Sequence, residues 1–224
     1  MRRGPATLYN RFAKRWFDAA ASATALVVLS PLLAGVAIAV RRAHGAPVMF
    51  RQTRTGAHGQ PFEILKFRTM TDARDADGQL LPDKDRLTPL GKWLRETSID
   101  ELPELINVLR GEMSLVGPRP LLHRYMQRYD ERQRHRHDCR PGLTGWVAVN
   151  GRNTTTWAER FEMDLFYVEN LSPALDLEIL LRTIATVLGR KGVDPGFADQ
   201  MPEFGTEANR PTLRMTVATR REST

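Results

Sequence analysis

The feature that most constrains this chain is an uncharged run of 22 residues, from Ala19 to Val40, in an otherwise polar protein with mean hydropathy −0.39. Apolar runs of about 18 residues or more usually indicate a membrane segment. A secretory signal peptide is disfavoured, because the run is longer than a usual apolar region and Arg41-Arg42 follows it directly. A buried core helix, a spanning helix and a re-entrant helix remain as alternatives.

Ser30-Pro31 lies at the middle of this run. A mid-helix proline removes one backbone hydrogen bond and clashes with the carbonyl four residues earlier, so the helix bends or breaks there. The larger aliphatic residues of the run favour insertion by roughly 3 to 5 kcal/mol in total. Proline in a helix interior costs about 3 kcal/mol, so full insertion of one straight helix is marginal.

Both flanks of the run are basic, with Lys14 and Arg15 before it and Arg41 and Arg42 after it. Lys and Arg are enriched on the cytoplasmic side of membranes, so a helix that enters, turns at Ser30-Pro31 and leaves by the same face satisfies both flanks. The Ser30 hydroxyl can donate to a carbonyl that Pro31 leaves without its partner. We expect this re-entrant arrangement, with a kinked single-pass anchor as the alternative.

The composition is that of a globular protein. In 224 residues, 42% are hydrophobic, which excludes a disordered or collagen-like chain. Lys and Arg outnumber Asp and Glu by 33 to 26, and the net charge of +7 indicates an anionic partner: nucleic acid, lipid headgroup or nucleotide. Cys139 is the single cysteine of the sequence, so there is no internal disulfide framework.

Beyond the apolar run, the patterns predict mostly helix with one small β-hairpin, an α+β fold. Two strands, Val48 to Thr53 and Pro61 to Thr69, flank a turn with Gly56 and Gly59, and 72–85 is a polar loop. Thr88-Pro89 and Ser172-Pro173 carry the signals of an N-cap followed by proline at the first helical position. Ser98 and Thr156 each begin a capping box, although Pro103 can shift the first of these caps by one or two residues. The last helix carries the apolar stripe Leu177, Leu180, Leu181, Ile184 and Leu188.

Asp100 and Glu101 are the carboxylates of most chemical interest. At a helix N-terminus, amide donors and the helix dipole keep a carboxylate ionised. An ionised aspartate can attack phosphorus or hold a magnesium ion. Adjacent side chains diverge by about 100°, so this pair cannot flank one bond as glycosidase carboxylates do. Simple capping residues are the alternative.

Several cations suit phosphate binding. Arg119 is held between two prolines after Gly117, and Arg152 follows a glycine in the segment 150–153. Glycine beside arginine permits close backbone approach to a phosphate under a guanidinium group. Lys66 and Arg68 alternate on a predicted strand and so share one face. Each cation taken singly can equally be a surface residue.

A second basic pattern recurs every four residues at Arg124, Arg128, Arg132 and Arg136. On one helix face, such a stripe is typical of a solvated surface or of contact with anionic headgroups. His135, His137 and Cys139 alternate, but on a helix they diverge, so a zinc site is disfavoured.

Taken together and in order, these motifs resemble the bacterial sugar transferases, the monotopic phosphoglycosyl transferases. The resemblance runs from about Phe12 to Gly192, with Glu104 where the family often has glutamine. The motifs that carry it are Ser30-Pro31, Lys66 to Met70, Leu94-Arg95, Ser98 to Pro103, Gly111 to Pro120, Pro141 to Trp146 and Asn150 to Asn153.

The resemblance implies a re-entrant membrane helix in 1–42, a compact catalytic domain with interfacial amphipathic helices in 43–191 and a tail in 192–224. It implies location at the cytoplasmic face of the bacterial inner membrane. The implied reaction transfers a phosphosugar from a UDP-sugar to a polyprenol (undecaprenyl) phosphate and releases UMP, as the first membrane step of glycan assembly, with Mg²⁺ as cofactor.

The resemblance also implies roles for individual residues. Asp100 is then the nucleophile, which forms a covalent phosphosugar intermediate, and a ligand of the metal, and Glu101 completes the dyad. The expected phosphate or substrate contacts are Lys66, Arg95, Arg119, Arg152 and Asp176.

Two other classes stand as alternatives. A basic nucleic-acid binder would explain the charge, but zinc-finger spacing and an RNA-binding aromatic signature are missing and the apolar run has no use there, so we expect no nucleic-acid partner. A non-catalytic membrane scaffold is the other. The sequence encodes neither the sugar nor the oligomeric state, and a homo-oligomer is left open.

Overall fold

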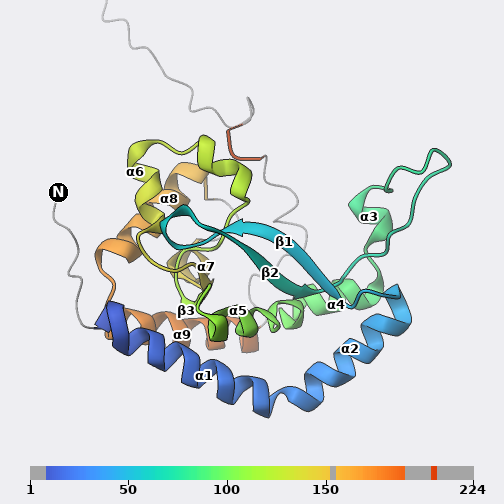
Figure 1. Cartoon of the computed structure of the whole chain (residues 1–224), viewed down its shortest axis with the longest axis horizontal. Coiled ribbons are helices and arrows are strands. Elements are labelled where there is room, and N and C mark those ends of the chain that lie inside the picture. Colours follow the sequence, from blue (N-terminus) through green and yellow to red (C-terminus); the bar gives the residue numbers. More distant parts are fainter. Residues whose placement is uncertain (1–8, 152–154, 190–202, 206–224) are drawn as a thin grey trace, which may run out of the picture.

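A computed structural model describes residues 9–151, 155–189 and 203–205 (Figure 1). The α-helices are α1 Lys14–Val28, α2 Ser30–His44, α3 Asp83–Arg86, α4 Pro89–Glu96, α5 Glu104–Arg110, α6 Glu131–Arg134, α7 Trp146–Asn150, α8 Trp157–Glu169 and α9 Pro173–Gly189. The strands are β1 Met49–Thr55, β2 Pro61–Phe67, β3 Ser114–Val116 and β4 Gly142–Thr144. A π-helical turn spans Tyr9–Ala13, and 3-10 turns span Ala57–Gly59, Ile99–Glu101, His123–Gln127 and His135–His137. The predicted α+β class, mostly helical, is confirmed.

The predicted hairpin is also confirmed, with small shifts at its ends. Strands β1 and β2 pair antiparallel, from Met49 opposite Phe67 to Thr55 opposite Pro61. A second pairing, between β3 and β4, is parallel and was not predicted. Each of these strands has three residues, too few for an alternating pattern to be recognised in the sequence.

The apolar run is bent at its proline. Helices α1 and α2 meet at Leu29 with an angle of 65° between them. Pro31 has no N–H for the carbonyl of Val27, and the Ser30 hydroxyl donates to that oxygen at 2.8 Å instead. The predicted bend and its hydrogen bond are confirmed. Within the described residues no single helix has the length and hydropathy to cross a bilayer, whereas the bent pair has them only when taken together.

Both ends of the bent helix pair are attached to the domain formed by the rest of the described residues. At the start of α1, Lys14 Nζ lies 2.6 Å from Asp176 Oδ2 of α9, and the Arg15 guanidinium donates to two carbonyls near the end of α5. At the end of α2, the His44 ring lies 2.7 Å from Thr88 Oγ1 and 3.0 Å from the Arg68 carbonyl. The bend therefore points away from the domain, as the arc under the other helices in Figure 1 shows.

Three of the predicted N-caps are correct. The Thr88 side chain accepts from the Gly91 amide, Thr156 forms its capping box, and Ser172 accepts from the Leu175 amide. Ser98 is different: it has a left-handed φ of 56° and no capping bond, and α5 begins only at Glu104. The capping box at Ser98 was wrong, and Asp100 lies on a 3-10 turn.

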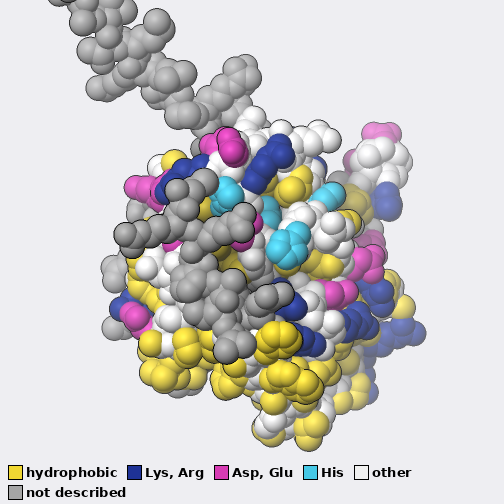
Figure 2. All heavy atoms as spheres, turned by 60° about the vertical axis from the view of Figure 1, so that its left-hand side comes forward, with side chains coloured by type: hydrophobic (Ala, Val, Ile, Leu, Met, Phe, Trp, Pro, Cys, Tyr) yellow, Lys and Arg dark blue, Asp and Glu magenta, His cyan; other side chains and the backbone are white. Residues whose placement is uncertain are grey.

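Three residues of the predicted apolar stripe of α9 face outward. Leu177, Leu181 and Ile184 are each more than half exposed, whereas Leu180 packs against a core cluster that contains the fully buried Ile179. Exposed apolar side chains of α1 and α2 add to them, and Figure 2 shows hydrophobic side chains gathered along the lower edge of the molecule. We call this set the apolar face: Trp16, Phe17, Val27, Val28, Leu32, Ile38, Leu177, Leu181 and Ile184.

Removal of the buried cation at Lys14 tests how α1 is held. We expect Lys14→Met to lower the free energy of unfolding by about 3 to 5 kcal/mol, because Asp176 stays buried without its cation. Thermal or denaturant unfolding in detergent measures this. The control Lys92→Met removes an exposed pair with Glu96 and should change stability by less than about 0.5 kcal/mol. The double variant Lys14→Met/Asp176→Asn should recover much of the loss. Equal stability of Lys14→Met and the control would contradict this role.

Candidate active site

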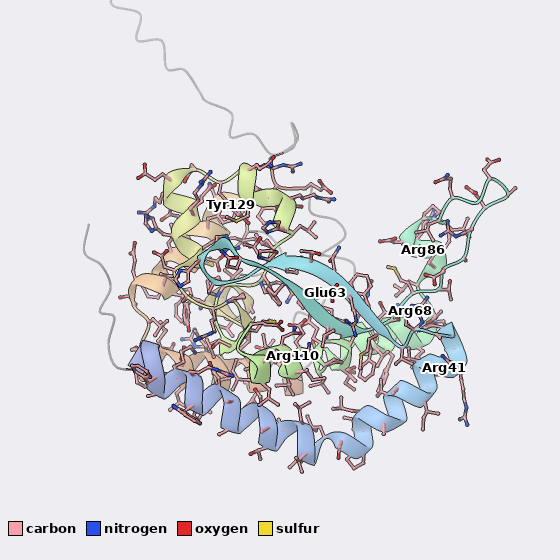
Figure 3. The ribbon with its side chains drawn as sticks, viewed as in Figure 1. Arg41, Glu63, Arg68, Arg86, Arg110 and Tyr129 are labelled. Atoms are coloured by element: carbon pink, nitrogen blue, oxygen red, sulfur yellow. The ribbon has the colours of Figure 1, made fainter. Side chains whose placement is uncertain are left out.

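An open cavity of about 790 Å³ lies between the hairpin, the loop after β2, and the turn that carries Asp100. This volume is typical of small-molecule sites. Six cationic side chains and four carboxylates line it: Arg54, Lys66, Arg68, Arg86, Arg95 and Arg119, with Asp72, Asp83, Asp100 and Glu101. Figure 3 shows Arg68 and Arg86 near the end of the hairpin and α3. The excess of positive charge suits an anionic ligand.

Asp100 reaches this cavity from the 3-10 turn Ile99–Glu101, which the left-handed Ser98 starts. Asp100 is 8% exposed. Burial, and then the charge of Glu101, raise the pKa of the Asp100 carboxyl to about 6, against the opposing charges of Lys66, Arg95 and Arg119. The three cations predicted for this site therefore act on one carboxylate.

Glu101 is engaged by two of these cations. Its Oε1 lies 2.5 Å from Lys66 Nζ and 2.6 Å from Arg119 Nη2. Burial opposes ionisation of Glu101, but the charges of Arg119 and Lys66 outweigh it and hold the pKa of this carboxyl below its usual range. Glu101 thus holds two cations in place and is unsuited to accept a proton.

Arg119 owes its position to close backbone packing. A Cβ on Gly117 would lie 2.4 Å from the Arg140 carbonyl, and one on Gly142 would lie 2.1 Å from the Gly117 amide nitrogen, so both positions need glycine. The Arg119 carbonyl accepts from Arg136 Nη2 at 2.8 Å. The side chain of Arg119 is 60% exposed and is available to a ligand.

Lys66 and Arg68 both line the cavity, as strand alternation predicted. Arg68 is held by Asp72 at 2.6 Å and by the Pro47 carbonyl at 3.0 Å. Arg95, on α4, donates from Nε to the Thr69 hydroxyl at 3.1 Å.

Among the described residues, one predicted site residue is not brought to this cavity. Asp176 does not line it: its Oδ2 accepts from Tyr9 and Lys14 and its Oδ1 from Tyr167, and the residue is 4% exposed. Both oxygens of Asp176 are thus occupied in a buried network, away from the cavity at which the substrate contact was predicted. Arg152 lies outside the described residues.

The cavity has side chains of the kind that bind magnesium. Among the described residues no three His, Cys, Asp or Glu side chains come together as a metal cluster. Besides Glu101, which is engaged by its cations, the carboxylates that line the cavity are Asp72, Asp83 and Asp100. Mg²⁺ is commonly bound by one or two carboxylates with substrate phosphates, so this donor set fits.

The arginine stripe is not a helix face, and that prediction was wrong. Asp130 caps a new short helix after a break, so the four arginines fall on separate turns. They pair as Arg124 and Arg128 with Glu203, Arg132 with Glu162, and Arg136, fully inside the domain, with Asp164. Part of the predicted tail, 203–205, is therefore packed, with Phe204 among the rings of Tyr125, Tyr129, Trp157 and Phe161.

Sequence reasoning missed Arg54. It lines the cavity from β1, donating to Gln52 Oε1 at 2.6 Å and to the Pro120 carbonyl at 3.3 Å. The signal was the alternation of Phe50, Gln52 and Arg54, but the predicted strand ended at Thr53, two residues before the end of β1.

Comparison with known proteins shows the family to which the sequence is similar. The family model described as bacterial sugar transferase matches residues 9–190. An uncharacterized sugar transferase, EpsL, of Bacillus subtilis is 51% identical over 80% of this chain and 89% of its own. A UDP-glucose:undecaprenyl-phosphate glucose-1-phosphate transferase of Caulobacter vibrioides is 43% identical over 78% of this chain and 69% of its own.

An undecaprenyl-phosphate glucose phosphotransferase of Komagataeibacter xylinus is 41% identical over 82% of this chain, but the match covers only 37% of that longer protein. The similarity extends over most of the present chain in each case. The chain belongs to the bacterial sugar transferase family.

Proposed function

We propose that this chain is a phosphoglycosyl transferase that moves a phosphosugar from a UDP-sugar to a polyprenol phosphate, such as undecaprenyl phosphate, and releases UMP. The observation that carries the proposal is Asp100 at an open cavity, under the combined charges of Lys66, Arg95 and Arg119. The names of the Caulobacter and Komagataeibacter relatives support the reaction class. We place it as the first membrane step of glycan assembly.

In the proposed mechanism Asp100 is the nucleophile. Its carboxylate oxygen attacks the phosphorus that bears the sugar, the bond to the UMP oxygen breaks, and UMP leaves with the electron pair. An oxygen of the polyprenol phosphate then attacks the same phosphorus, and the Asp100 carboxylate leaves. Both steps use one site, because each displaces a group from the same phosphorus.

The cations have distinct parts in this scheme. Lys66, Arg95 and Arg119, together with Arg152, contact the diphosphate oxygens and stabilise the charge that develops on them. Glu101 holds Lys66 and Arg119 in place. Bound Mg²⁺, with Asp100 as its protein ligand, would offset charge on the diphosphate and on the departing UMP.

The attachment of both ends of the bent helix pair supports a re-entrant membrane segment. A pair whose two ends bind one domain returns to the side from which it came. Each arm of 15 residues is about 22 Å long, and with the 65° bend the apex lies about 12 Å below its ends. That is less than half of a hydrocarbon core of about 30 Å. Val27 and Val28, at the apex, are about 70% exposed.

The apolar face supports a position of the domain on the same membrane surface. Its α9 residues are at helical spacing, as in an interfacial amphipathic helix. We place the protein at the cytoplasmic face of the bacterial inner membrane, where a soluble UDP-sugar and a lipid acceptor meet. The dispersal of the arginine stripe removes one argument for a nucleic-acid binder.

The reaction is tested by UMP release in detergent with polyprenol phosphate. We expect release with one member of a panel of UDP-glucose, UDP-galactose and UDP-N-acetyl sugars, dependent on the lipid phosphate and abolished by a chelator. UDP-glucose is the first donor to test, because two relatives are named for glucose. No UMP from any donor, by a folded protein, would favour the scaffold alternative.

Asp100→Asn tests the nucleophile. We expect UMP release to fall by more than about 10³-fold and the covalent phosphosugar adduct, observed by intact mass, to disappear. The fold should persist, since the amide is isosteric and removes a charge beside Glu101. In wild type the rate should fall as pH drops through about 6, because the protonated Asp100 carboxyl cannot attack. Near-normal turnover by Asp100→Asn would exclude this role.

Replacement of Ser30 and Pro31 by alanine tests the membrane arrangement. We expect the double variant to form a straighter helix and to move the N-terminus toward the opposite side, because the bend is lost. Single-cysteine labelling at both flanks, in the Cys139→Ser background, reports the side. The idea fails if the flanks of the wild type lie on opposite sides of the membrane.

A further inference from the structure

A second carboxylate, that of Glu104, lies near the Lys66 ammonium group that Glu101 binds. Glu104, the first residue of α5, is 3% exposed, and its Oε1 lies 3.2 Å from Lys66 Nζ. This oxygen accepts no hydrogen bond of suitable geometry from the described residues. Beside it is a cavity of about 10 Å³, about one water in size, lined by Arg54, Ile64, Lys66, Glu104, Arg119 and Pro120.

Lys66 thus serves two carboxylates at once. Its ammonium group lies 2.5 Å from Glu101 Oε1 on the side of the main cavity and 3.2 Å from Glu104 Oε1 on the buried side. Glu101 also binds Arg119, whereas Glu104 has only Lys66 at ion-pair distance among the described residues. A change in the charge of Glu104 must therefore act first on Lys66.

The charges that surround Glu104 make its protonation variable near neutral pH. Burial, and then the negative charge of Glu101, raise the pKa of Glu104 to about 7, and Lys66 and Arg119 oppose this. Arg54 lines the same small cavity, where burial lowers the pKa of its guanidinium and the charge of Glu104 opposes this. A glutamine at this position would have the same shape without the exchangeable charge.

We propose that Glu104 is a positioning residue for Lys66, and that its proton decides how much of the lysine charge is available to the diphosphate in the main cavity. With Glu104 neutral, Lys66 is directed to Glu101 and the substrate. With Glu104 ionised, Lys66 is drawn to the buried side and its charge is compensated. The inference rests on the proposed function, in which Lys66 contacts the diphosphate.

The consequence is an alkaline limb in the pH profile. The value of kcat/KM should fall as pH rises through the pKa of Glu104, about 7. In Glu104→Gln this limb should disappear. At pH 8 about one tenth of wild-type Glu104 is neutral, so the variant should exceed wild type by about tenfold in kcat/KM there and by little at pH 6.

The matched control is Glu63→Gln, an exposed glutamate that pairs with Arg51 outside the cavity, which should keep the wild-type profile. A merely structural role of Glu104 would change rate and stability without removing one limb. An alkaline limb in Glu104→Gln equal to that of wild type would overturn the inference. Absence of UMP release by wild type at every pH would instead overturn the proposed function.

A second measurement does not depend on the folding of Glu104→Gln. Infrared spectra of Asp100→Asn, recorded between pH 5 and 9, should contain one protonated carboxyl band that titrates near pH 7, assigned to Glu104. No carboxyl titration in this range would overturn the inference, because Glu104 would then keep one charge state throughout.

Discussion

A lysine and an aspartate buried between α1 and α9 hold the bent helix pair to the rest of the protein. Lys14 and Asp176 are 2.6 Å apart, both are almost inaccessible to solvent, and the hydroxyls of Tyr9 and Tyr167 donate to the remaining acceptor positions of the carboxylate. Burial of two charges is costly, so such a pair contributes more to a defined arrangement than to net stability. Its effect is to fix where α1 starts, and hence the direction in which the bent pair leaves the domain.

The other end of the bent pair packs against residues beside Asp100. Val36 and Val40 of α2 pack with Phe67 of β2 and Leu94 of α4, and Ile99 packs against the same cluster. Asp100 follows Ile99, and Arg95 follows Leu94. One apolar cluster therefore joins the helix that we place in the membrane to the residues that we place at the reacting phosphorus. This packing fixes the position of Asp100 relative to the bent helix pair.

Within the cavity, neighbouring carboxyl groups are driven to opposite behaviour. Two cations hold the pKa of Glu101 low, whereas burial and the charge of Glu101 raise the pKa of Asp100 and of Glu104. Environments that separate the pKa values of adjacent acids are typical of active sites, because one group can then brace while another reacts. Glu101 and Glu104 share Lys66, so the charge state of one affects the other.

Local features could be predicted from the sequence because neighbouring residues determine them. The bend at Pro31 follows from a missing N–H, the caps at Thr88 and Thr156 from side chains within a few residues of the amides they bind, and the hairpin from alternation and glycines. The Asp100–Glu101 pair and Arg119 were likewise visible as motifs. Only tertiary structure decided which of their partners meet. Asp176 binds Lys14 from 162 residues away, and Glu104 shares Lys66 with Glu101. Leu177, Leu181 and Ile184 of α9 face outward although their spacing equally suits a core. No local pattern encodes such choices, because the covering of a helix face depends on segments far apart in the chain.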